Sequence, residues 1–244
     1  MPLNPAKKQQ YGFSLIELAV VLVIVGILLG SILGTIGARI DNTRRAETQD
    51  ELDRIKLLLY GFALSQSPAR LPCPDTTNDG LEDLDLAGVS CATLTAPGNL
   101  PWRTLGIARG DAWSSNYSYW VADEYSNTAG FTAATNAAGV AEIRDSTAAP
   151  VNVISDNVAA VIFSHGKNSF GSIDVYDTPR PAIPAGAAYD NERENLDNDA
   201  APPVVFISRP VASEGATTAY DDHLDWISEY ELKGMMVQAG ALPP

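Results

Sequence analysis

The feature that most constrains this chain is one long apolar segment near its start. Residues 13–38 are 26 residues whose only formal charge is that of Glu17. A helix of that length is about 39 Å long, more than the roughly 30 Å of a bilayer's hydrocarbon core. No comparable run follows. We therefore expect a single transmembrane helix at residues 13–38.

The position of Glu17 sets a second constraint. A secretory signal has an apolar core of only about 7–15 residues followed by a small-residue cleavage site, so that reading does not fit. A plain membrane anchor fits the length but leaves the acid unexplained. A carboxylate at the centre of a membrane helix costs about 2.5–3.5 kcal/mol, and less near the end. Either Glu17 has a partner, or it reaches the membrane surface.

A short motif surrounds this acid. The run is Gly12-Phe13-Ser14-Leu15-Ile16-Glu17-Leu18, and a segment with Lys7 and Lys8 precedes it. It resembles the processing site of type IV pilins and type II secretion pseudopilins. In that family a membrane peptidase cuts after the glycine and methylates the new N-terminal phenylalanine. The resemblance implies a leader at residues 1–12, cleavage between Gly12 and Phe13, and N-methylation of Phe13.

The resemblance also implies a role for Glu17, the fifth residue of the mature chain. In a filament of parallel helices, a buried carboxylate needs a cationic partner. The free amino group of Phe13 on a neighbouring subunit would supply one, so Glu17 would fix the register of assembly. The implied partners are the prepilin peptidase and methylase, other pilin or pseudopilin subunits, and an inner-membrane assembly platform. The implied location is the inner membrane, with the remainder in the periplasm.

Beyond Arg39 the helix is expected to continue as an amphipathic stem over residues 39–66. Apolar residues recur three or four apart at Leu52, Ile55, Leu59 and Phe62. Residues 67–244 turn to Pro, Gly, Asn, Asp and Thr with short β-rich runs, which predicts a globular periplasmic or extracellular domain. The expected fold class is α+β and pilin-like, a long N-terminal helix packed on a small antiparallel β-sheet.

Local patterns place several elements in this domain. Strands are expected at 117–121, 140–144, 159–164 and 204–208. Ser228 with Glu231 forms a capping box for a short helix that Gly240 can end. Two segments are similar to parts of the major pseudopilins. DAWSSNYSYW at 111–120 is similar to their Asp-Pro-Trp-Gly turn and strand. The segment 161–177 is similar to a strand that runs into a Gly- and Asp-rich loop, which binds calcium in that group.

The chain has two cysteines, Cys73 and Cys91. In a domain outside the cytoplasm an even number of cysteines predicts a disulfide. Closing a loop of this size contributes about 3 kcal/mol. Two free buried thiols are the alternative, and metal chelation by the pair is a weaker one.

An acidic loop lies between these cysteines. DTTNDGLEDLD at 75–85 follows positions 1, 3, 5, 6 and 9 of a calcium loop, but position 12 is Leu86 rather than glutamate. The spacing predicts Ca²⁺ binding by Asp75, Asp79 and Asp83, with a solvated acidic turn as the alternative. A second acidic stretch, DNERENLDND at 190–199, has no recognisable ligand spacing.

Charge and residue usage narrow the function. A formal net charge of −14, from 30 acidic and 16 basic residues, argues against nucleic-acid binding. Ser164 and His165 are adjacent and would point to opposite faces of a strand, so they would not form a catalytic pair. His223 is expected to be solvated among aspartates. We therefore expect that the chain is not an enzyme. The sequence predicts a structural filament subunit. Its globular domain is large for a major subunit, which favours a minor pilin or pseudopilin. The alternative is a surface adhesin or receptor module displayed on a pilin stem.

Overall fold

In this computed structural model, the described residues are 14–93, 95–197, 202–212 and 219–242, and nothing is described of the side chains of residues 29 and 31–35. The chain divides into two compact units, with the boundary in the sequence between Thr43 and Arg44. Helix α1 (Leu15–Ser65) contains this boundary. The prediction that the helix continues beyond Arg39 is confirmed.

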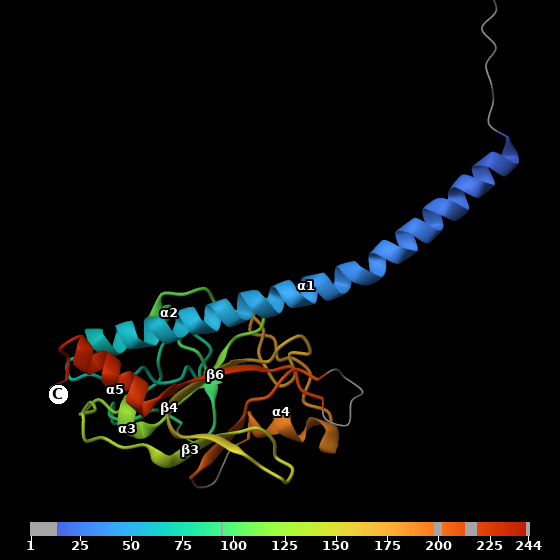
Figure 1. Cartoon of the computed structure of the whole chain (residues 1–244). Helices are drawn as coiled ribbons and strands as arrows, with labels where there is room; N and C mark the ends of the chain where they lie inside the picture. The colour runs from blue at the N-terminus through green and yellow to red at the C-terminus, as the bar shows by residue number, and fades with distance from the viewer. Residues whose placement is uncertain (1–13, 94, 198–201, 213–218, 243–244) are drawn as a thin grey trace, which may run out of the picture. The chain divides into compact units, whose positions relative to one another are not determined.

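The second unit contains the rest of α1 and a sheet (Figure 1). The predicted apolar stripe is the packed face of the helix, because Leu52, Ile55 and Leu59 are fully buried while Phe62 is partly buried. The helix ends at Ser65, just before Ser67, whose position ahead of Pro68 disfavours the helical conformation.

Six strands of the described chain form the sheet. They are β1 (Gly98–Asn99), β2 (Ser118–Val121), β3 (Ala138–Arg144), β4 (Val153–Ser164), β5 (Val204–Ile207) and β6 (His223–Ser228). Their order is β1-β2-β4-β3-β5, and β6 also pairs with β4. The long β4 pairs with β3 along its first part and lies between β2 and β6 along its second.

The α+β, pilin-like fold class is confirmed, but the sheet is mixed rather than purely antiparallel. Strands β3 and β5 run parallel, whereas every other pair among the described strands is antiparallel. A parallel pair needs a long connection. Here residues 145–203 supply it, and they include β4, the 3-10 helix η1 (Ala187–Tyr189) and helix α4 (Asp190–Glu194).

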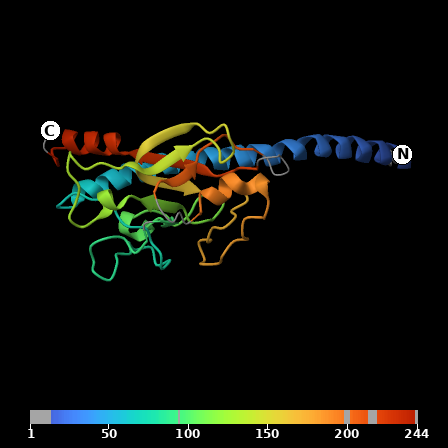
Figure 2. The same ribbon diagram turned by 90° about the horizontal axis from the view of Figure 1, so that it is seen from below.

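Three further helices complete the described elements: α2 (Trp102–Leu105), α3 (Asp123–Ser126) and α5 (Glu229–Gln238). The capping box predicted for the last one is present, since the Ser228 side chain accepts a hydrogen bond from the Glu231 backbone N–H. Gly240 follows with φ +74°, a left-handed conformation suited to a helix end. Figure 2 shows α5 beside the end of α1, and Lys56 joins the two helices through Glu231 at 3.8 Å.

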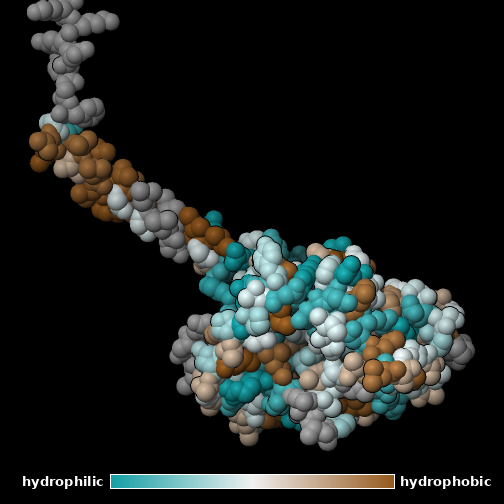
Figure 3. All heavy atoms as spheres, turned by 180° about the vertical axis from the view of Figure 1, so that it is seen from behind, coloured by the Kyte–Doolittle hydropathy of each residue, from teal (hydrophilic) through white to brown (hydrophobic). Residues whose placement is uncertain are grey.

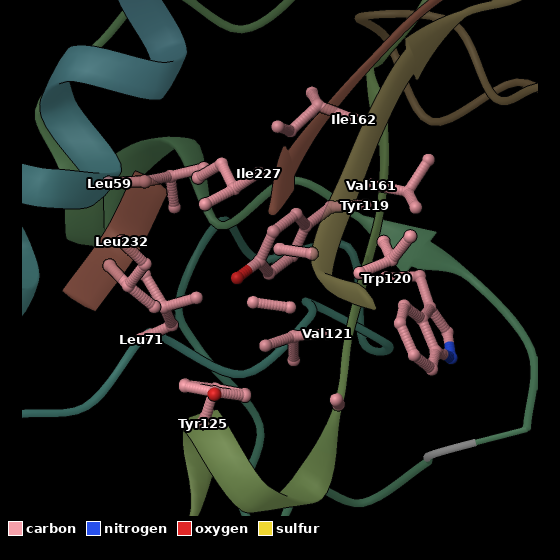
Figure 4. Close-up of a cluster of buried hydrophobic side chains, with 14 of the residues drawn as sticks. Leu59, Leu71, Tyr119, Trp120, Val121, Tyr125, Val161, Ile162, Ile227 and Leu232 are labelled. Atoms are coloured by element: carbon pink, nitrogen blue, oxygen red, sulfur yellow. The ribbon is translucent and has the colours of Figure 1, made fainter. Parts of the chain in front are cut away.

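The core lies between α1 and the sheet. Successive side chains of β2 alternate, so Tyr119 and Val121 point towards Leu59 of α1, whereas Trp120 points to the opposite face (Figure 4). On that opposite face Trp120 contacts Phe206 of β5, with ring centroids 5.7 Å apart. Both faces of β2 are therefore buried, which explains why three successive apolar residues, Tyr119, Trp120 and Val121, occur in it.

The packing of α1 gives a direct test of this arrangement. Leu59 is 0% exposed, whereas Leu57 on the same helix is 64% exposed. We expect Leu59→Ala to lower the free energy of unfolding by about 3 kcal/mol, because it leaves a cavity in the core. Leu57→Ala should change it by less than about 0.5 kcal/mol. Urea denaturation of both variants measures this, and equal small effects would show that α1 does not pack on the sheet.

Candidate functional site

The described chain begins at the motif that surrounds Glu17. The Ser14 backbone N–H donates to Glu17 Oε2 at 3.4 Å, and the Glu17 backbone N–H donates to Ser14 Oγ at 3.2 Å. This reciprocal pair is a capping box, with Ser14 as the N-cap of α1. The motif thus has a structural role within one chain that the sequence reading did not identify, although the Ser-x-x-Glu spacing could have indicated it.

The processing residues themselves, Gly12 and Phe13, lie outside the described residues. Cleavage between them, N-methylation of Phe13 and the pairing of its amine with Glu17 therefore stay predictions. Glu17 is exposed in the single chain. Its carboxylate is open to a partner from another subunit.

The first part of α1 presents apolar side chains to its surroundings. Figure 3 shows them as brown spheres along the helix. The exposed fractions are 89% for Leu15, 74% for Ile16, 63% for Leu22 and 68% for Ile27. Contiguous apolar surface of this kind marks an interaction site in a folded protein. Within the part of the chain that the structure describes, no helix meets the length and apolarity needed to cross a membrane.

The predicted disulfide is present. Cys73 and Cys91 are bonded, with Cα atoms 5.2 Å apart and a sequence separation of 18. Both cysteines are buried. Within the loop that the disulfide closes, Leu84 forms an isolated antiparallel β-bridge with Cys91. Glu82 holds the same loop from inside by accepting two hydrogen bonds of 2.7 Å from Arg70 and one of 3.1 Å from the Cys73 N–H.

The three aspartates predicted to bind calcium lie in this loop, each with its own local partners. Asp75 is 1% exposed and accepts backbone N–H donors from residues 77, 78 and 80. Asp83 accepts from Thr76 and the Thr77 N–H, and Asp79 from the Leu81 N–H. The structure does not gather the three carboxylates into a group of potential metal ligands. Calcium binding here stays a prediction.

Among the described residues, a different acidic group does come together. Ligand atoms of Glu192, Asp221 and Asp222 lie within 4.8 Å of one another. Glu192 comes from the acidic stretch at 190–199, but its two neighbours come from the residues just before β6. Burial, with the nearby charge of Glu192, raises the pKa of Asp221 to about 7 and raises the pKa of Asp222 well above its usual range. This cluster could hold a cation, but the acid group alone does not identify one.

The raised pKa of Asp221 predicts a pH effect on stability. Between pH 4 and about 7 the folded state holds a proton that the unfolded state has lost, so Asp221 makes the free energy of unfolding fall as pH rises. Burial lowers the pKa of His165 to about 4, which acts in the opposite direction below pH 6.5. The effect of Asp221 must therefore be isolated by comparing variants.

We expect Asp221→Asn to gain stability over the wild type by a few kcal/mol more at pH 8 than at pH 5. Asp53→Asn, an exposed change on α1, should give the same small difference at both pH values. Denaturation curves at the two pH values measure this. A difference between Asp221→Asn and wild type that does not change with pH would contradict it.

The two segments similar to the major pseudopilins contact each other. Ser164 Oγ donates to Asp111 Oδ2 at 2.5 Å, and Ser118 Oγ lies 2.8 Å from His165 Nε2. Ser164 and His165 thus turn to different partners, as expected from their adjacency. The expectation for His223 was wrong. It stacks on Trp113 with centroids 5.7 Å apart, and burial lowers its pKa.

The comparisons with known proteins bear on the N-terminal motif. The family model described as the prokaryotic N-terminal methylation motif matches residues 7–33. That motif is found on structural subunits that are processed by a prepilin peptidase, anchored in a membrane and then assembled with other pilins. The chain therefore carries the signature of type IV pilins and pseudopilins. Comparisons with curated proteins and with solved structures found no match.

Proposed function

We propose that the chain is a minor pilin or pseudopilin, a structural subunit of a type IV pilus or a type II secretion-like filament. The observation that carries this proposal is the methylation motif at residues 7–33, placed directly before and across the start of α1. The resemblance of the sequence and the α+β fold with a packed stem helix support it. The domain that follows the stem is large for a major subunit, which favours a minor one.

The membrane step of this proposal rests on the sequence. Residues 13–38 are long enough for a helix that spans a bilayer, and their single charge lies at the start. The exposed apolar side chains of α1 would contact lipid before assembly and other stem helices afterwards. Because the peptidase of this family acts on the cytoplasmic face, the leader would lie in the cytoplasm and the domain in the periplasm.

Glu17 would serve two purposes in turn. In the single chain it caps α1 through Ser14. In the filament its exposed carboxylate would pair with the methylated amine of Phe13 on a neighbour. A carboxylate and an amine brought together in an apolar core favour only the axial stagger that joins them, because any other stagger leaves a buried charge unpaired.

The test is incorporation into filaments. In cells that express the peptidase and a major subunit, the tagged full-length chain should appear in the sheared-filament fraction, at low stoichiometry, with residues 1–12 removed. Its deletion should reduce the number of filaments. If deletion abolishes attachment while filament number and length stay at the wild-type level, the chain is an adhesin displayed on a pilin stem and the structural proposal is wrong.

A further inference from the structure

The second unit contains a polar cavity that the assembly proposal does not use. Its volume is about 250 Å³. It is lined by residues of three segments: Gln49 of α1, Ser208 and Arg209 after β5, and Tyr220, Asp222 and His223 around the start of β6. A polar space of this size holds several waters or one small polar group.

Two nitrogen atoms of this wall lack a hydrogen-bond partner among the described residues. Arg209 Nε and His223 Nε2 are both buried and unpaired. Buried polar atoms are almost always hydrogen-bonded in folded proteins, so unpaired atoms beside a cavity indicate that its contents supply their partners. Arg209 Nε always carries a hydrogen and needs an acceptor, whereas His223 Nε2 donates in the tautomer that carries its proton there. The Nε–H of arginine, together with a terminal N–H, forms a fork that matches the two oxygens of a carboxylate or phosphate.

The charges around the cavity also favour an anion. Arg45 lies one helical turn before Gln49 on α1, and its charge, after burial, lowers the pKa of His223. The guanidinium groups of Arg45 and Arg209 are thus both near this cavity, although the chain as a whole has a net charge of −14. Trp113 stacks on the His223 ring with an interplanar angle of 16°, which holds the imidazole against the cavity wall.

Asp222 is the one acidic residue among the described residues that line the cavity, and its carboxyl is buried and hydrogen-bonded. It is 5% exposed, and its Oδ2 accepts a hydrogen bond of 2.8 Å from Asn195. Burial and the charge of Glu192 raise the pKa of this carboxyl well above its usual range. Burial thus disfavours the negative charge on Asp222, which lessens its repulsion of an anion in the cavity.

We propose that this cavity binds an oxyanion, a phosphate or carboxylate group, with Arg209 as the charged ligand and with His223 and Gln49 as further donors. The group could belong to a small soluble anion or to an acidic side chain of another protein. The proposal concerns the globular domain alone and does not depend on how the N-terminal motif is processed.

The test is titration of the full-length chain in detergent with inorganic phosphate and, separately, with acetate at constant ionic strength. At about ten times Kd, a bound anion should raise Tm by about 3 °C. Arg209→Gln should abolish the shift. Arg54→Gln should keep it, because this side chain is 62% exposed on α1 and does not line the cavity. A shift with phosphate, alone or with acetate, indicates a free anion, and a shift with acetate alone indicates a protein carboxylate.

A second variant avoids the risk that Arg209→Gln fails to fold. Gln49 is exposed on the helix surface, so Gln49→Glu should leave the fold intact while placing a negative charge at the cavity. It should weaken anion binding about tenfold or more. The proposal is overturned if neither anion shifts Tm of the wild type, or if Gln49→Glu binds the anion as tightly as the wild type does.

Discussion

Glu17→Gln should abolish incorporation into filaments while membrane insertion and cleavage proceed normally. Glutamine can still complete the capping box with Ser14, so α1 should start where it does now. It cannot neutralise the amine of Phe13 on a neighbouring subunit. Leaving one charge of a buried pair alone costs about 3–5 kcal/mol, which corresponds to a reduction in incorporation of roughly 100-fold or more.

The capping box supplies a matched control for this prediction. Ser14→Ala removes the cap but keeps the carboxylate of Glu17, at a cost of about 1 kcal/mol to the helix start. It should therefore reduce incorporation far less than Glu17→Gln does. Sheared-filament fractionation, with the major subunit present, measures both variants. Wild-type incorporation of Glu17→Gln would mean that the charge of Glu17 has no role in assembly.

Removing the disulfide should strongly destabilise the globular domain. Replacing Cys73 and Cys91 together with alanine should lower the free energy of unfolding by about 3 kcal/mol, because the loop of sequence separation 18 is no longer closed in the unfolded chain. For a domain of this size the expected fall in Tm is about 6–12 °C.

Chemical labelling provides the check on this second prediction. The unfolded, non-reduced protein should show no free thiol, and reduction during unfolding should give the wild type the stability of the double alanine variant. Two labelled cysteines without reductant would contradict the pairing. The hydrogen bonds from Arg70 and the Cys73 N–H to Glu82 remain in the variant, so the loop should keep its folded conformation.

Features that depend on neighbouring residues in the chain could be predicted from the sequence. The apolar stripe of α1 and the cap of α5 at Ser228 are local patterns, and the structure confirms both. Strand β6 was not predicted, because its sequence, HLDWIS, does not alternate regularly between apolar and polar residues. It forms a strand because it pairs with β4, which is distant in the sequence.

The acidic residues show the limit of reasoning from spacing. The calcium-like spacing of Asp75, Asp79 and Asp83 is visible in the sequence. In the structure, however, each of these carboxylates accepts hydrogen bonds from its own backbone or hydroxyl donors. The group that does converge joins Glu192 with Asp221, and no pattern in the sequence relates segments so far apart. Such groups are created by the tertiary fold alone.

The central claim, that this chain is a processed filament subunit, is tested most directly by the mass of its N-terminal peptide. In cells that contain a prepilin peptidase, the mature chain should begin at an N-methylated Phe13, and Gly12→Ala should leave the chain uncleaved. The motif at residues 7–33 leads to this expectation. A mature protein that still begins at Met1 in those cells, or a cut elsewhere in residues 1–38, would contradict the account.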